Sequence, residues 1–257
     1  MGREARARSA VPGTVAILSS ESPRSAAFCQ AWTRVQLPPG THVEWITGGP
    51  NIAHNRNLAV QALQGEWLWM LDDDMLMRPD TLTRLLAHVA HPEVAIVAPF
   101  CLKRVPPYTP VFATKTPTGM SPATPSPDAR GLQPVAAIGT AGMLIRATVL
   151  ETLPFPWFQV GRWHPVRLDE DYTFCAAAAE AGFQAFVDLD TPMGHITPFA
   201  IWPARNAEGW GPSYHAIFST SSTQCVELMD KAVAEAYDGI FAPELRPPLT
   251  IGEAVPA

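Results

Sequence analysis

The apolar positions before residue 100 fall into short runs that turn residues separate. Residues 14–20 and 67–71 are apolar and rich in β-branched or aromatic side chains, which is typical of buried strands. Residues 41–47 are expected to form another strand, which Gly48, Gly49 and Pro50 end. Residues 55–63 instead repeat apolar side chains at helical spacing, and Gly65 ends that helix. Strands that alternate with helices in this way predict an α/β fold with a mostly parallel central sheet flanked by helices.

The same alternation continues, with one interruption, to residue 197. Residues 103–134 are rich in Pro, Thr and Ser and hold too few apolar side chains for a packed element, so a long loop is expected there. The run at 183–187 is expected to be the last strand, and a late amphipathic helix is expected at 223–237. The other expected elements are strands at 94–98, 135–138 and 142–145, and helices at 22–32, 78–89, 148–153 and 169–181.

One domain accounts for most of the 257 residues, because a second full domain would leave two small pieces. A tail at 1–13 is expected before a domain at 14–197. The segment at 198–257 would then hold the late helix and a Pro-rich tail.

Composition narrows the class of protein. Charged residues make up 16% of the chain and hydrophobic residues 47%, yet no run approaches the roughly 20 apolar residues that a membrane helix needs. The early arginines are not followed by the apolar stretch of a secretory signal, so a soluble, cytoplasmic protein is expected. A net charge of −6 argues against nucleic-acid binding by general electrostatics. The four cysteines are far apart and form no C-x-x-C pair, which argues against a zinc site and against disulfides.

Three aspartates, Asp72, Asp73 and Asp74, directly follow the apolar run at 67–71. Ligands of parallel α/β sheets bind at the carboxyl ends of the strands. Adjacent carboxylates repel one another unless a cation neutralises them, so the triplet is a candidate site for a hard metal ion. The alternative is a solvated acidic turn before the next helix, but the position after a buried strand favours the metal site.

Several motifs occur in an order that resembles the GT-A glycosyltransferases of family 2. They are a helix with an Asn-Arg pair, a strand that ends in D-x-D, a Gly-rich strand that ends in Arg, acidic residues that open a helix, and a later His. The matching segments of this chain are 55–59, 65–74, 139–146, 169–175 and 194–195, and the resemblance spans 14–197.

The resemblance implies a GT-A-like, Rossmann-like domain in which residues 14–100 bind the nucleotide and residues 101–197 hold the acceptor. It implies transfer of a sugar from a nucleotide-sugar, most commonly a UDP-sugar, with Mn²⁺ or Mg²⁺. The acceptor would carry a hydroxyl group on a saccharide, a protein or a modified nucleic-acid base. The implied roles are metal binding by Asp74 and His195, donor binding by Arg56, Asp72 and Asp73, and inverting catalysis by the base Asp171 with Glu170 orienting the acceptor.

Each implied role has a plainer alternative. Arg56 would be a surface helix residue, His195 a structural histidine, and the acids at 169–171 a helix cap. The aromatic segment 155–164 would border the acceptor or form a packed lid. A nucleotidyltransferase is a second enzyme class, but residues 19–22 do not form the Gly-rich, basic phosphate loop it would need. A binding module without catalysis is the non-enzyme alternative. The presence of Asp74, Asp171 and His195 together argues against it.

Overall fold

A computed structural model describes residues 13–19, 25–104, 108–117, 119–163, 166–196, 199–206 and 209–216. The helix expected at 223–237, the Pro-rich tail and all of the expected amino-terminal tail except Gly13 lie outside these residues. Within the described part of the chain, no helix is long and apolar enough to cross a membrane.

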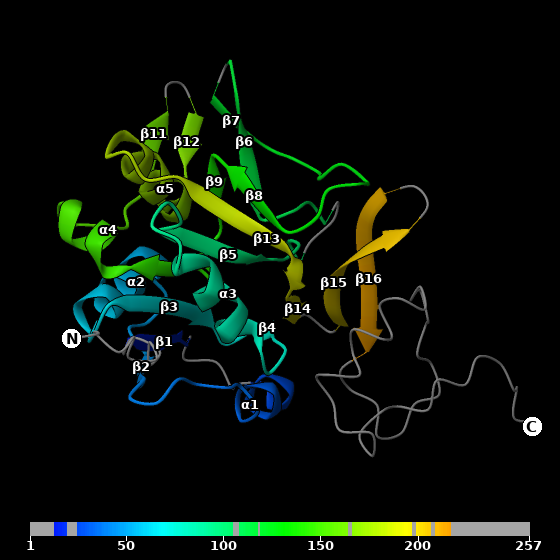
Figure 1. Cartoon of the computed structure of the whole chain (residues 1–257), viewed down its shortest axis with the longest axis horizontal. Coiled ribbons are helices and arrows are strands. Elements are labelled where there is room, and N and C mark those ends of the chain that lie inside the picture. Colours follow the sequence, from blue (N-terminus) through cyan, green and yellow to red (C-terminus); the bar gives the residue numbers. More distant parts are fainter. Residues whose placement is uncertain are drawn as a thin grey trace, which may run out of the picture.

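A seven-stranded sheet with the order β2-β1-β3-β10-β5-β13-β8 forms the centre of the molecule (Figure 1). Strands β2, β1, β3, β5 and β13 run in one direction, so the mostly parallel sheet expected from the apolar runs is confirmed. These five strands are β1 (Thr14–Leu18), β2 (His42–Ile46), β3 (Trp67–Asp72), β5 (Ile96–Phe100) and β13 (Ala185–Pro192).

Two strands run against this direction. Strand β10 (Leu144–Arg146) lies between β3 and β5 and is antiparallel to both, and β8 (Leu132–Val135) is antiparallel to β13. Because β10 is reversed, the residues just before it lie at the carboxyl end of β3, where the Met70 amide donates to the Met143 carbonyl over 2.9 Å. Arg146 lies at the opposite end of these strands, where it is paired with Trp67 at the start of β3. Its side chain donates to backbone carbonyls, including that of His91, which follows the helix that ends at Val89.

Helices cover both faces of the sheet. Alternate side chains of β3 belong to the two hydrophobic clusters that lie on these faces. Leu68 and Met70 belong to one buried cluster, while Trp67, Trp69 and Leu71 belong to the other, because successive strand residues point to opposite faces. The helices are α1 (Ala26–Trp32), α2 (Ile52–Gln61), α3 (Thr81–Val89), α4 (Ala147–Thr152) and α5 (Glu170–Glu180). Helix α1 is capped by Ser25, whose side chain accepts from the Ala27 amide, while the expected start of this helix at residue 22 lies outside the described residues.

The long loop expected at 103–134 is wrong, because this segment carries three strands. Strand β6 (Phe112–Thr116) pairs with β7 (Gly119–Pro122) and with β9 (Ala137–Ile138), and β8 joins the central sheet. Only the first two residues of β6 are buried, so its pattern contains no apolar run.

The expectation that 183–187 forms the last strand is also wrong. Strands β14 (Gly194–Ile196), β15 (Phe199–Asn206) and β16 (Gly209–Ala216) follow β13. With β4 (Met75–Leu76) they form a four-stranded antiparallel sheet beside the central one (Figure 1). A short pair, β11 (Gly161–Trp163) and β12 (Val166–Leu168), contacts α5.

Candidate active site

The aspartate triplet lies where β3 ends and turns into β4. Asp72 is the last residue of β3, and Asp73 and Asp74 form the turn. Strand β4 pairs with β14 so that His195 is opposite Met75, and the Ile196 amide donates to the Asp74 carbonyl over 2.7 Å. This pairing brings His195 Nε2 within 3.3 Å of Asp74 Oδ2. Two residues far apart in the sequence are therefore neighbours at the carboxyl end of the sheet.

The ring of His195 is oriented by a backbone carbonyl. Its Nδ1 lies 3.0 Å from the Leu102 carbonyl oxygen, and since a carbonyl can only accept, Nδ1 carries the proton. The other nitrogen, Nε2, is thereby turned toward Asp74. Burial lowers the pKa of His195, but the hydrogen bond and charge of Asp74 outweigh burial and raise this pKa above its usual value.

Asp74 also contacts Arg104, whose Nη1 lies 2.6 Å from the same oxygen, Oδ2. Burial would raise the pKa of the Asp74 carboxyl, but His195 and Arg104 outweigh it, and the net pKa lies below the usual range. The carboxylate is thus kept ionised between two nitrogen-bearing side chains.

Asp72 is held by Arg56, which is inside the protein and not on a helix surface. The Arg56 guanidinium donates to both carboxylate oxygens of Asp72, over 3.0 and 3.2 Å, and its Nε donates to Glu170 Oε1 over 3.4 Å. Burial lowers the pKa of Arg56, but Asp72 and Glu170 outweigh this effect and raise the pKa above its usual value. Arg56 therefore stays charged. A buried cation is tolerated when such partners satisfy it. Arg56 therefore links the end of β3 to the start of α5.

Asp73 faces the end of β1. The Ser19 hydroxyl donates to Asp73 Oδ2 over 2.5 Å, and the Asp73 amide donates to the Leu18 carbonyl over 3.1 Å. The three aspartates thus have three different partners. Among the described residues, no three His, Cys, Asp or Glu side chains converge as a ready metal cage.

Asp171 has a pKa far above the usual value of an aspartate. Burial, followed by repulsion from Glu170, raises the pKa of Asp171 to about 7, although Arg56 and the Tyr172 amide act in the other direction. Asp169 occupies the N-cap position of α5 but makes no side-chain capping bond. The backbone at Gly139 approaches closely, because a Cβ there would stand 3.5 Å from Asp171 Oδ2. The arrangement gives a carboxyl group that changes protonation near neutral pH.

The pair of Asp74 and His195 fits a divalent ion in its separation. Two neighbouring ligands of an octahedral ion, each about 2.1 Å from it, are about 3 Å apart, and the observed distance between Nε2 and Oδ2 is 3.3 Å. The fixed proton on Nδ1 leaves the Nε2 lone pair for coordination when the ring is neutral. Other ligands of such an ion would come from the substrate or from water.

No sequence motif pointed to Arg104, to the Leu102 carbonyl or to Ser19. Their roles depend on strands that come together only in the fold, and the single signal in the sequence is that residues 103–146 hold five basic residues against one acid. Arg146, which ends the Gly-rich strand, lies at the far edge of the sheet and takes no part in this region.

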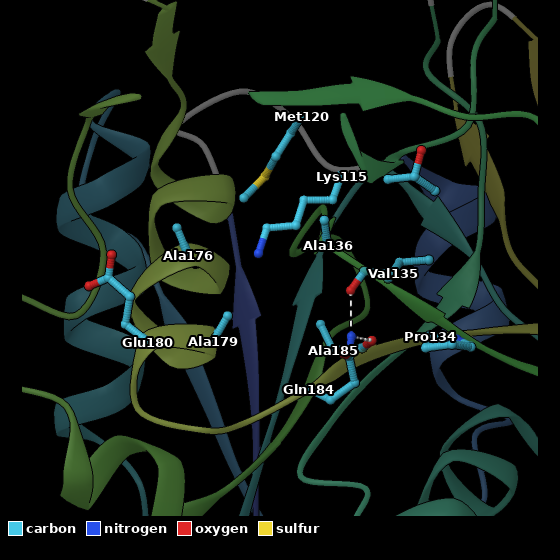
Figure 2. A pocket seen from close by; sticks show the side chains of 11 residues that line it. Lys115, Met120, Pro134, Val135, Ala136, Ala176, Ala179, Glu180, Gln184 and Ala185 are labelled. Carbon is cyan, nitrogen blue, oxygen red and sulfur yellow. Dashed lines mark hydrogen bonds between the residues drawn. The ribbon is translucent and has the colours of Figure 1, made fainter. Parts of the chain in front are cut away.

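A cavity of about 480 Å³ lies elsewhere, between α5 and the β6–β7 hairpin. Figure 2 shows Lys115 and Met120 reaching over it from the hairpin, with Ala176 and Ala179 on the helix side. The side-chain Nε2 of Gln184, in the wall of this cavity, already donates to the carbonyl oxygens of Val135 and Ala185. Ala185, also in the wall, begins β13, so the cavity is at the opposite end of the sheet from the aspartates. Most of its lining residues are apolar, and Glu180 is the single acid among them.

Comparison with known proteins adds to this geometry. Residues 15–153 match the family described as Glycosyl transferase family 2, a stretch that includes Arg56, the aspartate triplet and Arg104. No curated protein sequence matches the chain. The crystal structure of A197 from STIV aligns with a TM-score of 0.56 and 12% identity, over 82% of this chain and 99% of that one. The mannosyltransferase PcManGT from Pyrobaculum calidifontis, in complex with GDP-Man and Mn²⁺, aligns with a TM-score of 0.44 and 15% identity, over 70% of this chain and 55% of that one.

Proposed function

This chain belongs to glycosyl transferase family 2, and from that membership we propose that it transfers a sugar from a nucleotide-sugar to a hydroxyl acceptor with inversion at the anomeric carbon. The fold is GT-A-like and the protein is a glycosyltransferase. The donor, the metal and the residues below are our proposal. A UDP-sugar is the proposed donor by analogy within the family.

Asp74 and His195 are the proposed protein ligands of a Mn²⁺ or Mg²⁺ ion. The ion would neutralise the charge that develops on the departing diphosphate. The Leu102 carbonyl keeps Nε2 of His195 available for this by accepting a hydrogen bond from the Nδ1–H group. The low pKa of Asp74 keeps its carboxylate ionised without any ion present.

Asp72 and Asp73 are proposed to accept hydrogen bonds from hydroxyl groups of the donor. Arg56 holds Asp72 at both oxygens, and Ser19 holds one oxygen of Asp73. Each carboxylate keeps further lone pairs, so both can bind a hydroxyl while their direction is fixed. In this proposal Arg56 acts on the donor through Asp72, because Nε, Nη1 and Nη2 of Arg56 each already donate to a carboxylate.

Asp171 is proposed to take the proton of the acceptor hydroxyl. The acceptor oxygen forms its bond to the anomeric carbon, the bond from that carbon to the diphosphate oxygen breaks, and the proton goes to the Asp171 carboxylate. A pKa of about 7 suits a base that must gain and release a proton near neutral pH. Glu170, held by Arg56, would orient the acceptor.

One observation carries the proposal: a single buried guanidinium joins Asp72, at the proposed donor end, to Glu170, beside the proposed base. This link between Asp72 and Glu170 supports the proposal that the triplet and the acids of α5 border one site, as sugar transfer between two substrates requires.

Calorimetry of UDP binding with and without Mn²⁺ tests the proposal. We expect Mn²⁺ to strengthen UDP binding to the wild-type protein, and Asp74→Ala to weaken the Mn²⁺-dependent part at least ~10-fold. Glu151→Ala, an exposed acid on α4, is the control and should bind as wild type. Unchanged Mn²⁺-dependent binding in Asp74→Ala would exclude Asp74 as the ligand. Absence of metal-dependent binding of both UDP and GDP to the wild type would refute the proposed function.

A further inference from the structure

Arg104 contacts the carboxylate oxygen that is proposed to bind the metal. Its Nη1 lies 2.6 Å from Asp74 Oδ2, the same oxygen that lies 3.3 Å from His195 Nε2. A guanidinium and a divalent ion that share one oxygen repel each other, so Arg104 in this position opposes binding of the ion at Asp74. Binding of the ion is therefore expected to favour movement of Arg104 away from Asp74.

The two residues before Arg104 are held by backbone pairing, while the Arg104 side chain is largely exposed. The Lys103 amide donates to the Thr109 carbonyl over 2.9 Å, and Leu102 forms a β-bridge with Pro110. The Arg104 side chain is 55% exposed beyond this point. The same strand end supplies the Leu102 carbonyl that orients His195. Arg104 can thus change partner without displacing the histidine.

We propose that Arg104 has two positions, one on Asp74 in the metal-free protein and one on the diphosphate of the bound donor. The inference depends on the proposed function, because the diphosphate would reach Asp74 only through a shared ion. A planar guanidinium matches phosphate oxygens as it matches a carboxylate, so one anionic partner replaces another. Arg56 is buried between Asp72 and Glu170 and is not available for this role.

If Arg104 has these two positions, its removal should change the affinity for Mn²⁺ alone and the affinity for UDP in opposite directions. Removal of the guanidinium removes a competitor for Asp74, so Mn²⁺ alone should bind about 2–5-fold more tightly to Arg104→Ala, the range of a partly exposed ion pair. It also removes a partner of the diphosphate, so UDP at saturating Mn²⁺ should bind about 10-fold more weakly. A side chain with a merely structural role would not move the two affinities in opposite directions.

The experiment is calorimetry of Mn²⁺ alone, then of UDP at saturating Mn²⁺, with GDP where UDP does not bind. It compares wild type, Arg104→Ala, Arg104→Lys and the control Lys103→Ala, which removes the neighbouring exposed cation. Arg104→Lys should keep part of the UDP affinity, and Lys103→Ala should match the wild type in both titrations.

The outcomes separate this inference from the proposed function. If the wild type binds neither nucleotide in a Mn²⁺-dependent way, both fall. If the wild type does bind and Arg104→Ala either matches it or loses affinity for Mn²⁺ alone, only the inference about Arg104 is overturned.

Discussion

Asp72, Asp73 and Asp74 are adjacent in the chain, yet each carboxylate has a different partner. Arg56 holds the first, Ser19 the second, and His195 with Arg104 the third. Three carboxylates on one turn repel one another, and distribution over separate partners reduces that repulsion. The sequence predicted the triplet as a site but not these partners, because a partner in another segment leaves no local pattern.

The pKa of Asp171 leads to a prediction for activity. A base must be ionised, so kcat/KM should rise with pH and level off above about 7. Asp171→Asn should keep UDP binding and lower turnover by roughly 10²–10⁴-fold. Initial rates between about pH 5.5 and 9 with a verified acceptor measure both, and NMR of the product gives its anomeric configuration. Near-normal turnover in Asp171→Asn, or retained configuration, would remove Asp171 from the mechanism.

The raised pKa of Asp171 also predicts how the stability of the folded protein depends on pH, and how Asp171→Asn should differ from the wild type. The pKa of Asp171 is raised in the folded protein, so between about pH 4 and 7 the folded state binds more protons than the unfolded state, and stability falls as the pH rises. Asp171→Asn lacks this loss and should be more stable than wild type at pH 8. Asp169→Asn, at the neighbouring N-cap position, is the matched control for both measurements.

At the scale of elements, helix α2 connects three other parts of the protein through consecutive residues. The side-chain Nδ2 of Asn55 donates to the Gly49 carbonyl over 2.8 Å, Arg56 binds Asp72 and Glu170, and the Asn57 side chain bonds the backbone of Phe158. Consecutive helix residues point about 100° apart, so the three side chains reach different neighbours. Helix α2 therefore fixes the position of the loop before α5 as well as the acids of the site.

Asn57 gives a prediction for this connection. It donates to the Phe158 carbonyl over 2.7 Å and accepts from the Phe158 amide over 3.1 Å, and both bonds are buried. Asn57→Ala leaves two buried backbone groups without partners and should lower the free energy of unfolding by about 2–4 kcal/mol. Urea denaturation measures this, with Gln61→Ala at the exposed end of α2 as control, expected within about 0.5 kcal/mol of wild type. Equal stability of the two variants would mean that Phe158 finds other partners.

Elements with long apolar runs were predictable from the sequence, and those without such runs were not. Strands β1, β3 and β5 are buried along their whole length or nearly so, and their sequences show it. Strand β6 buries only Phe112 and Ala113, and β16 contains Pro212 among glycines, so neither resembles an isolated strand. Both are stabilised by pairing with a neighbour, which single-sequence patterns do not reveal. For the same reason no motif marked Arg104 as a site residue, whereas the triplet after a buried strand marked Asp74.

At the scale of the whole molecule, ligand binding should raise the apparent stability. A ligand that binds only the folded protein adds about 2.7 kcal/mol at 100 times its Kd, and for a chain of this size that corresponds to roughly 5–10 °C in Tm. Mn²⁺ with UDP should therefore shift the melting curve of the wild type and shift that of Asp74→Ala by about half as much or less, because a ~10-fold loss of affinity removes about half of the stabilisation. Differential scanning fluorimetry measures the shift, with Mg²⁺ alone and UDP alone as controls. An equal shift in both proteins would place the ligand at a site without Asp74.

The reversed strand β10 has a consequence for fragments of this protein. It is the strand that joins β3 to β5, so a piece that ends near residue 140 would have β2, β1 and β3 on one side and β5 on the other, with nothing between them. The facing edges of β3 and β5 would expose unpaired backbone groups on strands that are almost wholly apolar. Such edges pair readily with other chains. A truncated protein should therefore aggregate, and during synthesis the central sheet can close only after residue 146 has left the ribosome.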